Sequence, residues 1–143
     1  MGHNIKTVWK EGMAFDSQLM GGNIALDANE AVGGQGKGVT PKQLMLSALS
    51  GCTAMDVASL MKKMRVEVDG FDVSVEGELT DQHPKYYKTV KVVYNFEGKN
   101  LDQAKLNKIV NMSIERYCGV FEMFRQFADI TTEINFVEAN VGV

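Results

Sequence analysis

The first 32 residues alternate between apolar and polar side chains in short stretches. The alternation is clearest over residues 5–10 and 23–27, and the pair Gly21-Gly22 marks a turn before the second stretch. A period of two is typical of strands that bury one face. Residues 1–32 are therefore predicted to form two or three strands, and the glycine-rich residues 33–39 a mobile loop.

A long helix is predicted over residues 40–65. Thr40 suits the N-cap position, Pro41 the first helical position and Gln43 the third, a combination that forms a capping box. Residues 44–52 are apolar on nearly every helical face, so we expect the helix to lie buried in the middle of the fold. Polar residues interrupt this stretch before it reaches the roughly 18 apolar residues of a membrane span, so no membrane association is expected.

In the second half of the chain the spacing of apolar residues changes from that of strands to that of helices and back again. Residues 70–97 alternate on both sides of a turn near His83, which predicts a β-hairpin. Residues 101–128 then show helical spacing with a break at Gly119, and residues 130–137 alternate again as a closing strand. The order predicts a single α+β domain, residues 1–143, with antiparallel sheet around the central helix. One face of the first predicted helix after the hairpin carries Leu106, Ile109, Val110 and Ser113.

Composition and charge exclude several classes of protein. The 143 residues carry a net charge of -3, and their 15 basic residues are scattered, so no basic stripe is available to bind nucleic acid. The N-terminus has no apolar core of a signal peptide, so we expect a cytoplasmic protein with reduced thiols. The two histidines and two cysteines fit no zinc-binding spacing, so no structural metal is expected.

The cysteines are the candidate reactive groups. Cys52 lies in the most apolar helical stretch, directly after Gly51, and a glycine inside a helix costs up to about 1 kcal/mol relative to alanine. Cys118 lies at the junction of two predicted helices, and a helix beginning after Gly119 would favour its thiolate. A single cysteine, taken alone, is more often a small buried apolar residue than a reactive group. Asp56 and Glu122 each follow a cysteine by four residues, and we interpret them as solvated or N–H-bonded carboxylates rather than catalytic bases.

Several motifs resemble the OsmC/Ohr superfamily, and the resemblance covers nearly the whole chain. The Trp9 to Phe15 start, the Cys-x-x-x-Asp-Val form and the Tyr-Cys pair are similar to the YhfA-like branch in particular. The motifs are Gly33-Gly34, Gly38-Val39-Thr40-Pro41-Lys42-Gln43-Leu44, Ala48-Leu49-Ser50-Gly51-Cys52-Thr53-Ala54-Met55-Asp56-Val57 and Arg116-Tyr117-Cys118.

The resemblance implies an intertwined homodimer whose two sites each combine Cys52 with Cys118 of the same chain. It also implies reduction of small organic hydroperoxides in oxidative stress defence, without metal or flavin. Cys52 would attack the O–O bond and become a sulfenic acid. Cys118 would then form a disulfide with it, and an external dithiol would reduce that disulfide.

The chain departs from the family pattern at the charged groups that support the reactive thiolate. Peroxidatic members use an arginine from the N-terminal region and a glutamate early in the central helix. Here no arginine precedes Arg65, and Lys42 and Gln43 stand at the helix start. A cysteine without a fixed cation among apolar neighbours reacts slowly. The candidate substitutes are Lys10, Lys37, Lys42 and Arg116, of which Arg116 is the possible charge partner that we select.

Two alternatives remain open from the sequence. A dimer that keeps the fold and an apolar pocket but lacks peroxidatic power would serve as a stress or small-molecule-binding protein. The same two thiols would also support a redox role on another substrate, such as sulfur transfer or disulfide sensing.

Overall fold

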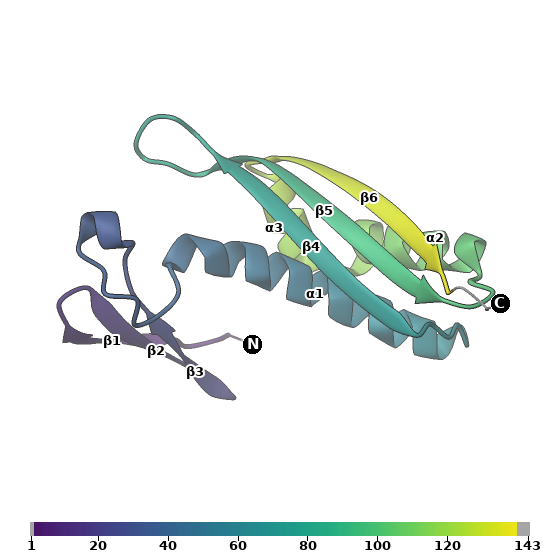
Figure 1. Cartoon of the computed structure of the whole chain (residues 1–143), viewed down its shortest axis with the longest axis horizontal. Coiled ribbons are helices and arrows are strands. Elements are labelled where there is room, and N and C mark those ends of the chain that lie inside the picture. Colours follow the sequence, from purple (N-terminus) through teal and green to yellow (C-terminus); the bar gives the residue numbers. More distant parts are fainter. Residues whose placement is uncertain (1, 140–143) are drawn as a thin grey trace. The chain divides into compact units, whose positions relative to one another are not determined.

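The computed structural model describes residues 2–139, and the chain divides into two compact units after Met45 (Figure 1). The first unit contains a meander of three antiparallel strands in sequential order, β1 (Lys6–Glu11), β2 (Ala14–Leu19) and β3 (Gly22–Leu26), as the alternation predicts. A short 3-10 turn, η1 (Glu30–Val32), follows the meander.

The glycine-rich loop, which the sequence predicts to be mobile, makes several hydrogen bonds to one carboxylate. The buried carboxylate of Asp27 accepts hydrogen bonds from the backbone N–H groups of Ala28, Gln35 and Lys37 at 2.8, 2.9 and 3.0 Å. These bonds, with that from Lys37 the strongest influence, lower the pKa of Asp27. Glycine is required at position 34, where a Cβ would lie 1.6 Å from the carbonyl oxygen of Ala28.

The second unit contains a sheet of three strands in the order β4 (Gly70–Leu79), β5 (Tyr87–Gly98) and β6 (Asp129–Glu138). Strands β4 and β5 form the predicted antiparallel hairpin. Strand β6 instead runs parallel to β5, so the prediction of an antiparallel sheet throughout is wrong for this strand. A parallel neighbour requires a crossover of a dozen or more residues, and the helical segment between β5 and β6 provides it.

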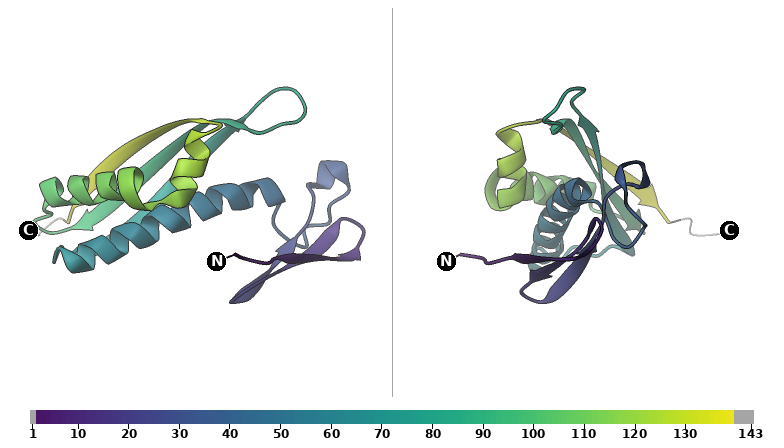
Figure 2. Two further views of the ribbon diagram at one scale, coloured as in Figure 1. Left: turned by 180° about the vertical axis from the view of Figure 1, so that it is seen from behind. Right: turned by 90° about the vertical axis from the view of Figure 1, so that its left-hand side faces the viewer.

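The core of this unit lies between the sheet and the helices that cover one of its faces (Figure 2). Helix α1 (Pro41–Lys63) packs against the same core as α2 (Gln103–Met112) and α3 (Gly119–Arg125). Alternate residues of β5 face the helices, which explains the period of two in that strand. The buried side chains from these elements include Leu49, Val57, Val90, Val92, Tyr94, Phe96, Leu106, Ile109, Val110, Phe121 and Phe124.

Helix α1 buries one face rather than its whole circumference. Its buried residues are Leu49, Thr53, Val57 and Leu60, whereas Met55 on the opposite side is 75% exposed. By length and composition alone α1 would be able to cross a membrane, and 28% of its most apolar window is buried. Its packing against the β4–β6 sheet fits the core helix of an α+β protein.

The start of α1 follows the predicted signals in part. Pro41 is the first helical residue, and the side-chain amide of Gln43 donates a hydrogen bond to the hydroxyl of Thr40. In a capping box the two side chains accept hydrogen bonds from backbone N–H groups. Here the predicted residues are in place, but their side chains bond directly to each other.

A π-helical turn, η2 (Ser113–Tyr117), separates α2 from α3. The backbone N–H of Cys118 donates to the carbonyl oxygen of Ser113 at 2.8 Å, a bond that spans five residues. Such turns occur often at functional sites. The sequence predicts the break near Gly119 and does not distinguish the π-helical turn from ordinary α-helix.

Phe96 offers a direct test of this core. Its ring is fully buried and stacks between Phe71 and Phe136, with ring centroids 4.8 and 5.9 Å away. Replacing Phe96 with alanine should lower the free energy of unfolding by about 3–5 kcal/mol, because it removes these contacts and leaves a cavity. Urea denaturation measures the change. The exposed Tyr86 provides a control, since Tyr86→Ala should stay within about 0.5 kcal/mol of the parent; equal losses would contradict this description of the core.

Candidate active site

The structure brings the two cysteines together although 65 residues separate them in the sequence. Cys52 lies in α1, and Cys118 lies between η2 and α3. Both thiols are free, and their sulfur atoms lie within 4.8 Å of each other. A disulfide has an S–S distance of about 2.05 Å, so the two sulfur atoms must move closer together before they can bond.

The two thiols differ in their access to solvent. Cys52 is half-buried and lies at the border between the buried face of α1 and its exposed apolar side. Cys118 belongs to the hydrophobic core and is only 3% exposed. A small reagent that enters from solvent therefore meets Cys52 first.

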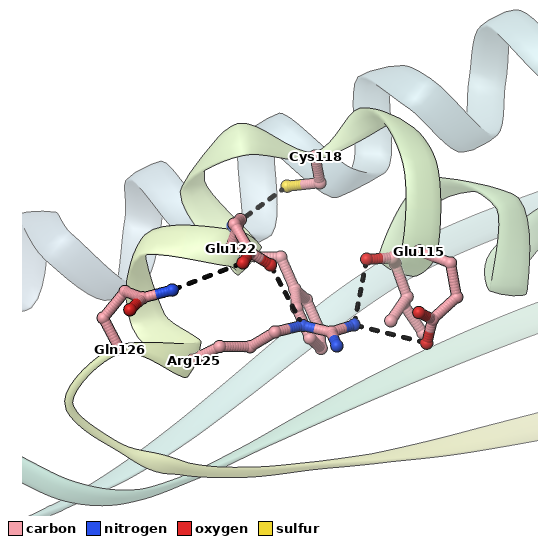
Figure 3. A network of polar contacts seen from close by, with 7 residues as sticks. Glu115, Cys118, Glu122, Arg125 and Gln126 are labelled. Atoms are coloured by element: carbon pink, nitrogen blue, oxygen red, sulfur yellow. Dashed lines mark hydrogen bonds and ion pairs between the residues drawn. The ribbon is translucent and has the colours of Figure 1, made fainter.

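Burial raises the pKa of Cys118 to about 12, and the neighbouring Cys52 and Asp56 act in the same direction. The backbone N–H of Phe121 opposes them by donating a hydrogen bond to the sulfur of Cys118 at 3.3 Å (Figure 3). Helix α3 does begin directly after Cys118, as the sequence suggests. The N–H group at this helix end favours the thiolate, as expected, but desolvation outweighs this single donor.

Asp56 lies beside the two thiols. One of its carboxylate oxygens is within 4.8 Å of both sulfur atoms. Its Oδ2 accepts a hydrogen bond from the hydroxyl of Ser113 at 2.9 Å. Asp56 is half-buried, and its hydrogen-bond partner in the protein is a buried hydroxyl rather than the backbone N–H group that was one of the two expected environments.

Glu122, the other carboxylate that follows a cysteine by four residues, is exposed and forms an ion pair with Arg125 at 3.5 Å. It also accepts a hydrogen bond from the side-chain amide of Gln126 at 3.3 Å (Figure 3). It matches the prediction of a solvated carboxylate. The same spacing therefore gives two different environments at the two cysteines.

A chain of buried hydroxyl groups continues from Ser113 into the core. The hydroxyl of Thr53 lies 2.7 Å from the hydroxyl of Ser113 and 2.7 Å from that of Tyr94. All three side chains are fully buried. The only sequence signal was the position of Ser113 on the apolar face of a predicted helix, and nothing marked Thr53 or Tyr94.

Arg116, the charge partner selected from the sequence, is exposed in the single chain, and its role stays a prediction. Lys37, another proposed substitute, pairs with Glu11 inside the first unit. The arginine that fixes the segment around Cys118 is Arg125. Its guanidinium donates to the carbonyl oxygen of Ile114 at 3.0 Å, pairs with Glu115 at 3.3 Å and lies 5.0 Å from the centre of the Phe121 ring (Figure 3).

Cys52, Asp56 and Cys118 are also a possible set of metal donors, because one atom from each lies within 4.8 Å of the others. We expected no metal from the sequence, and we assign none here. Two free thiols at this distance are sufficient for disulfide chemistry, which requires no metal.

Comparison with known proteins identifies relatives along nearly the whole chain. The family model described as OsmC-like protein matches residues 34–133. Protein YhfA of Escherichia coli K12 is 29% identical over 132 residues, which are 92% of this chain and 96% of that protein.

Two solved structures share the fold. A hypothetical protein from Aquifex aeolicus has a TM-score of 0.86 at 22% identity, covering 98% of this chain and 99% of that one. An organic hydroperoxide resistance protein OsmC from Legionella pneumophila has a TM-score of 0.70 at 17% identity, covering 94% and 97%.

The difference between the two thiols is testable by alkylation. In folded, reduced protein at pH 8, iodoacetamide should label Cys52 and leave Cys118 unmodified, because only thiolates react and Cys118 keeps its proton until the pH approaches about 12. Peptide mass mapping measures both sites. Protein unfolded in guanidinium chloride should label at both cysteines; equal labelling in the folded protein would refute the assignment.

Proposed function

The chain belongs to the OsmC-like protein family, and from this premise we propose that it is a thiol peroxidase that reduces organic hydroperoxides through Cys52 and Cys118. The observation that carries the proposal is the pair of free thiols within 4.8 Å, one half-buried and one in the core. On this proposal the protein works in the cytoplasm, where an external dithiol keeps the cysteines reduced.

The reaction has three steps. The Cys52 thiolate attacks the peroxide O–O bond, an alcohol leaves after taking a proton, and Cys52 becomes a sulfenic acid. The thiol of Cys118 attacks that sulfur, water leaves, and a Cys52–Cys118 disulfide forms. The external dithiol then reduces the disulfide through a mixed disulfide, so each cycle converts one hydroperoxide and one dithiol into alcohol, water and an oxidised dithiol.

The accessibility and protonation of the thiols support this assignment of roles. The attacking thiol must meet a substrate from outside, and Cys52 is the more accessible of the two. Cys118 holds its proton and lies beside Cys52, which suits a group that acts only after the sulfenic acid has formed.

An apolar surface beside Cys52 supports an organic substrate. Met45, Ala48 and Met55 are exposed on α1, and their spacing of three and seven residues places them along one side of the helix, next to Cys52. Such a surface suits the apolar part of an organic hydroperoxide better than hydrogen peroxide. The fold relatives include proteins described as organic hydroperoxide resistance proteins, from Legionella pneumophila and Bacillus subtilis.

We also propose that two copies of the chain form an intertwined homodimer that covers this side of α1. Proteins of this family are generally homodimers. Within residues 2–139, a Cβ at Gly51 would meet no atom within 4 Å apart from the neighbouring backbone of α1, so this part of the chain offers no packing reason for a glycine at that position. A second copy lying close to the helix would supply one and would complete an apolar pocket over Cys52.

The dimer predicts a solution mass of twice 15.8 kDa by light scattering. Met55→Glu should shift the mass toward that of the monomer, because it places a charge in the covered surface where Met55 is 75% exposed in the single chain. Glu67→Gln is the control. Glu67 is exposed and follows α1 in the sequence, so this substitution should leave the mass unchanged. A parent protein that runs as a monomer at micromolar concentration would contradict the proposal.

The peroxidase cycle is tested by adding one equivalent of cumene hydroperoxide to reduced protein and following intact mass and peptide maps. The parent should lose two hydrogens with a Cys52–Cys118 cross-link, and faster than with hydrogen peroxide. Cys118→Ser should stop at a Cys52 sulfenic acid that dimedone traps, because the resolving thiol is missing. Cys52→Ser should retain less than about one-hundredth of the turnover, since it removes the nucleophile.

A Cys52→Ser variant with full turnover would refute the mechanism. Parent thiols that stay free for minutes with either peroxide would favour the second candidate function, a non-catalytic dimer that binds small apolar molecules. The observation that favours this alternative is the absence of any arginine before Arg65, which leaves the family's supporting cation without a counterpart in that region.

A further inference from the structure

The buried hydroxyl chain has a defined direction that ends at the thiols. Each hydroxyl has one proton to donate, and Ser113 donates its proton to Asp56. Thr53 must therefore donate to Ser113 across their 2.7 Å contact, and Tyr94 must donate to Thr53 across theirs. Burial raises the pKa of Tyr94 to about 12, which keeps it a donor. All three protons point toward the carboxylate of Asp56.

This arrangement holds the carboxylate of Asp56 beside the reacting sulfur atoms. Ser113 occupies Oδ2 of Asp56, and within residues 2–139 no hydrogen bond to Oδ1 is found. A carboxylate oxygen lies within 4.8 Å of both the Cys52 and the Cys118 sulfur atoms. The charged and titratable groups around it come from α1, β5 and the η2–α3 junction, and they are Cys52, Tyr94 and Cys118.

We propose that Asp56 accepts the proton of Cys118 when Cys118 attacks oxidised Cys52, and that Ser113 positions Asp56 for this transfer. The inference rests on the proposed function and adds a proton acceptor to its second step. The carboxylate is a suitable acceptor because Cys118 reacts as a thiolate and must lose its proton within the buried site.

The proposed step is balanced. The sulfur of Cys118 forms a bond to the sulfur of the Cys52 sulfenic acid, while the S–O bond of that acid breaks. The proton of Cys118 passes to Asp56 and from there to the departing hydroxide, which leaves as water. Cys118 is oxidised, Cys52 is reduced from sulfenic acid to disulfide, and Asp56 ends as it began, having passed the proton on.

If the hydroxyl chain and Asp56 had a purely structural role, their substitution would lower the stability of the fold and leave the rate of disulfide formation unchanged. Buried hydroxyls need partners in any core, and their loss typically costs about 1–3 kcal/mol. Tyr94→Phe removes the far end of the chain and leaves the bond between Ser113 and Asp56 intact. It should therefore lower the melting temperature and leave the rate of disulfide formation unchanged. Asp56→Asn keeps the shape and an acceptor for Ser113 but removes the proton acceptor.

The experiment measures the second step without peroxide. Excess 5,5′-dithiobis(2-nitrobenzoic acid) converts Cys52 to a mixed aryl disulfide with release of one aryl thiolate, and attack by Cys118 releases a second. Absorbance records both phases. The parent should release two equivalents per chain, and Asp56→Asn should slow the second phase at least tenfold without slowing the first, since proton acceptors typically contribute about 10²–10⁴ in rate.

Glu122→Gln is the matched control, because Glu122 also follows a cysteine by four residues but pairs with Arg125 away from the thiols. It should leave both phases unchanged. A second phase in Asp56→Asn as fast as in the parent would overturn the inference. Treating the parent and Cys118→Ser with cumene hydroperoxide separates the two proposals. If the parent completes both aryl phases but forms no disulfide with the peroxide, and Cys118→Ser forms no sulfenic acid that dimedone traps, the role of Asp56 is kept and the peroxidase is lost.

Discussion

The candidate site depends on the hydrogen bonds that the hydroxyl of Thr53 makes inside the core. It lies in the middle of α1 and makes 2.7 Å hydrogen bonds to Tyr94 of β5 and Ser113 of η2, all in the absence of solvent. Unpaired buried hydroxyls are costly, so these bonds fix the rotation of α1 about its axis against the sheet and the π-helical turn. With that rotation fixed, Cys52 lies at the edge of the buried face and Asp56 beside it.

The same constraint gives the two cysteines different properties. They lie within 4.8 Å of each other, yet Cys118 is in the core with its proton retained, whereas Cys52 is half-buried next to exposed apolar side chains. Arg125 stabilises this difference from the other side, because it ties Ile114 and Glu115 to α3 and so holds the segment that carries Cys118. A pair with one accessible and one buried thiol suits successive attack and resolution.

The sequence predicted those features that follow from local pattern. The strand periods, the helix start at Pro41 and the break near Gly119 all depend on neighbouring residues, and the structure has them close to the expected positions. Alternation carries no direction, so the parallel pairing of β6 could not be read from it. The hydroxyl chain joins Thr53 to Tyr94, 41 positions further along the sequence, and to Ser113, 60 positions further along. No local sequence pattern marks partners at such separations.

Asp56 illustrates the same limit at the site itself. Its position four residues after Cys52 was visible, and so was the like-charge effect on a thiol, but the identical spacing of Glu122 after Cys118 gave no reason to separate them. Only the tertiary structure shows that one carboxylate is held by a buried serine and the other by an exposed arginine. What separates the two carboxylates is the packing of α1 against η2, which brings Asp56 to Ser113.

The carboxylate of Asp56 has different consequences for the two steps of the proposed cycle. It supplies no positive charge to the attack on a peroxide, and a cysteine without a fixed cation nearby reacts slowly. The same carboxylate accepts the proton of Cys118 and speeds the closure of the disulfide. Slow attack followed by fast closure keeps the sulfenic acid short-lived, which limits its further oxidation to the irreversible sulfinic and sulfonic acids. On this mechanism the site reacts slowly with the peroxide but protects Cys52 from irreversible oxidation.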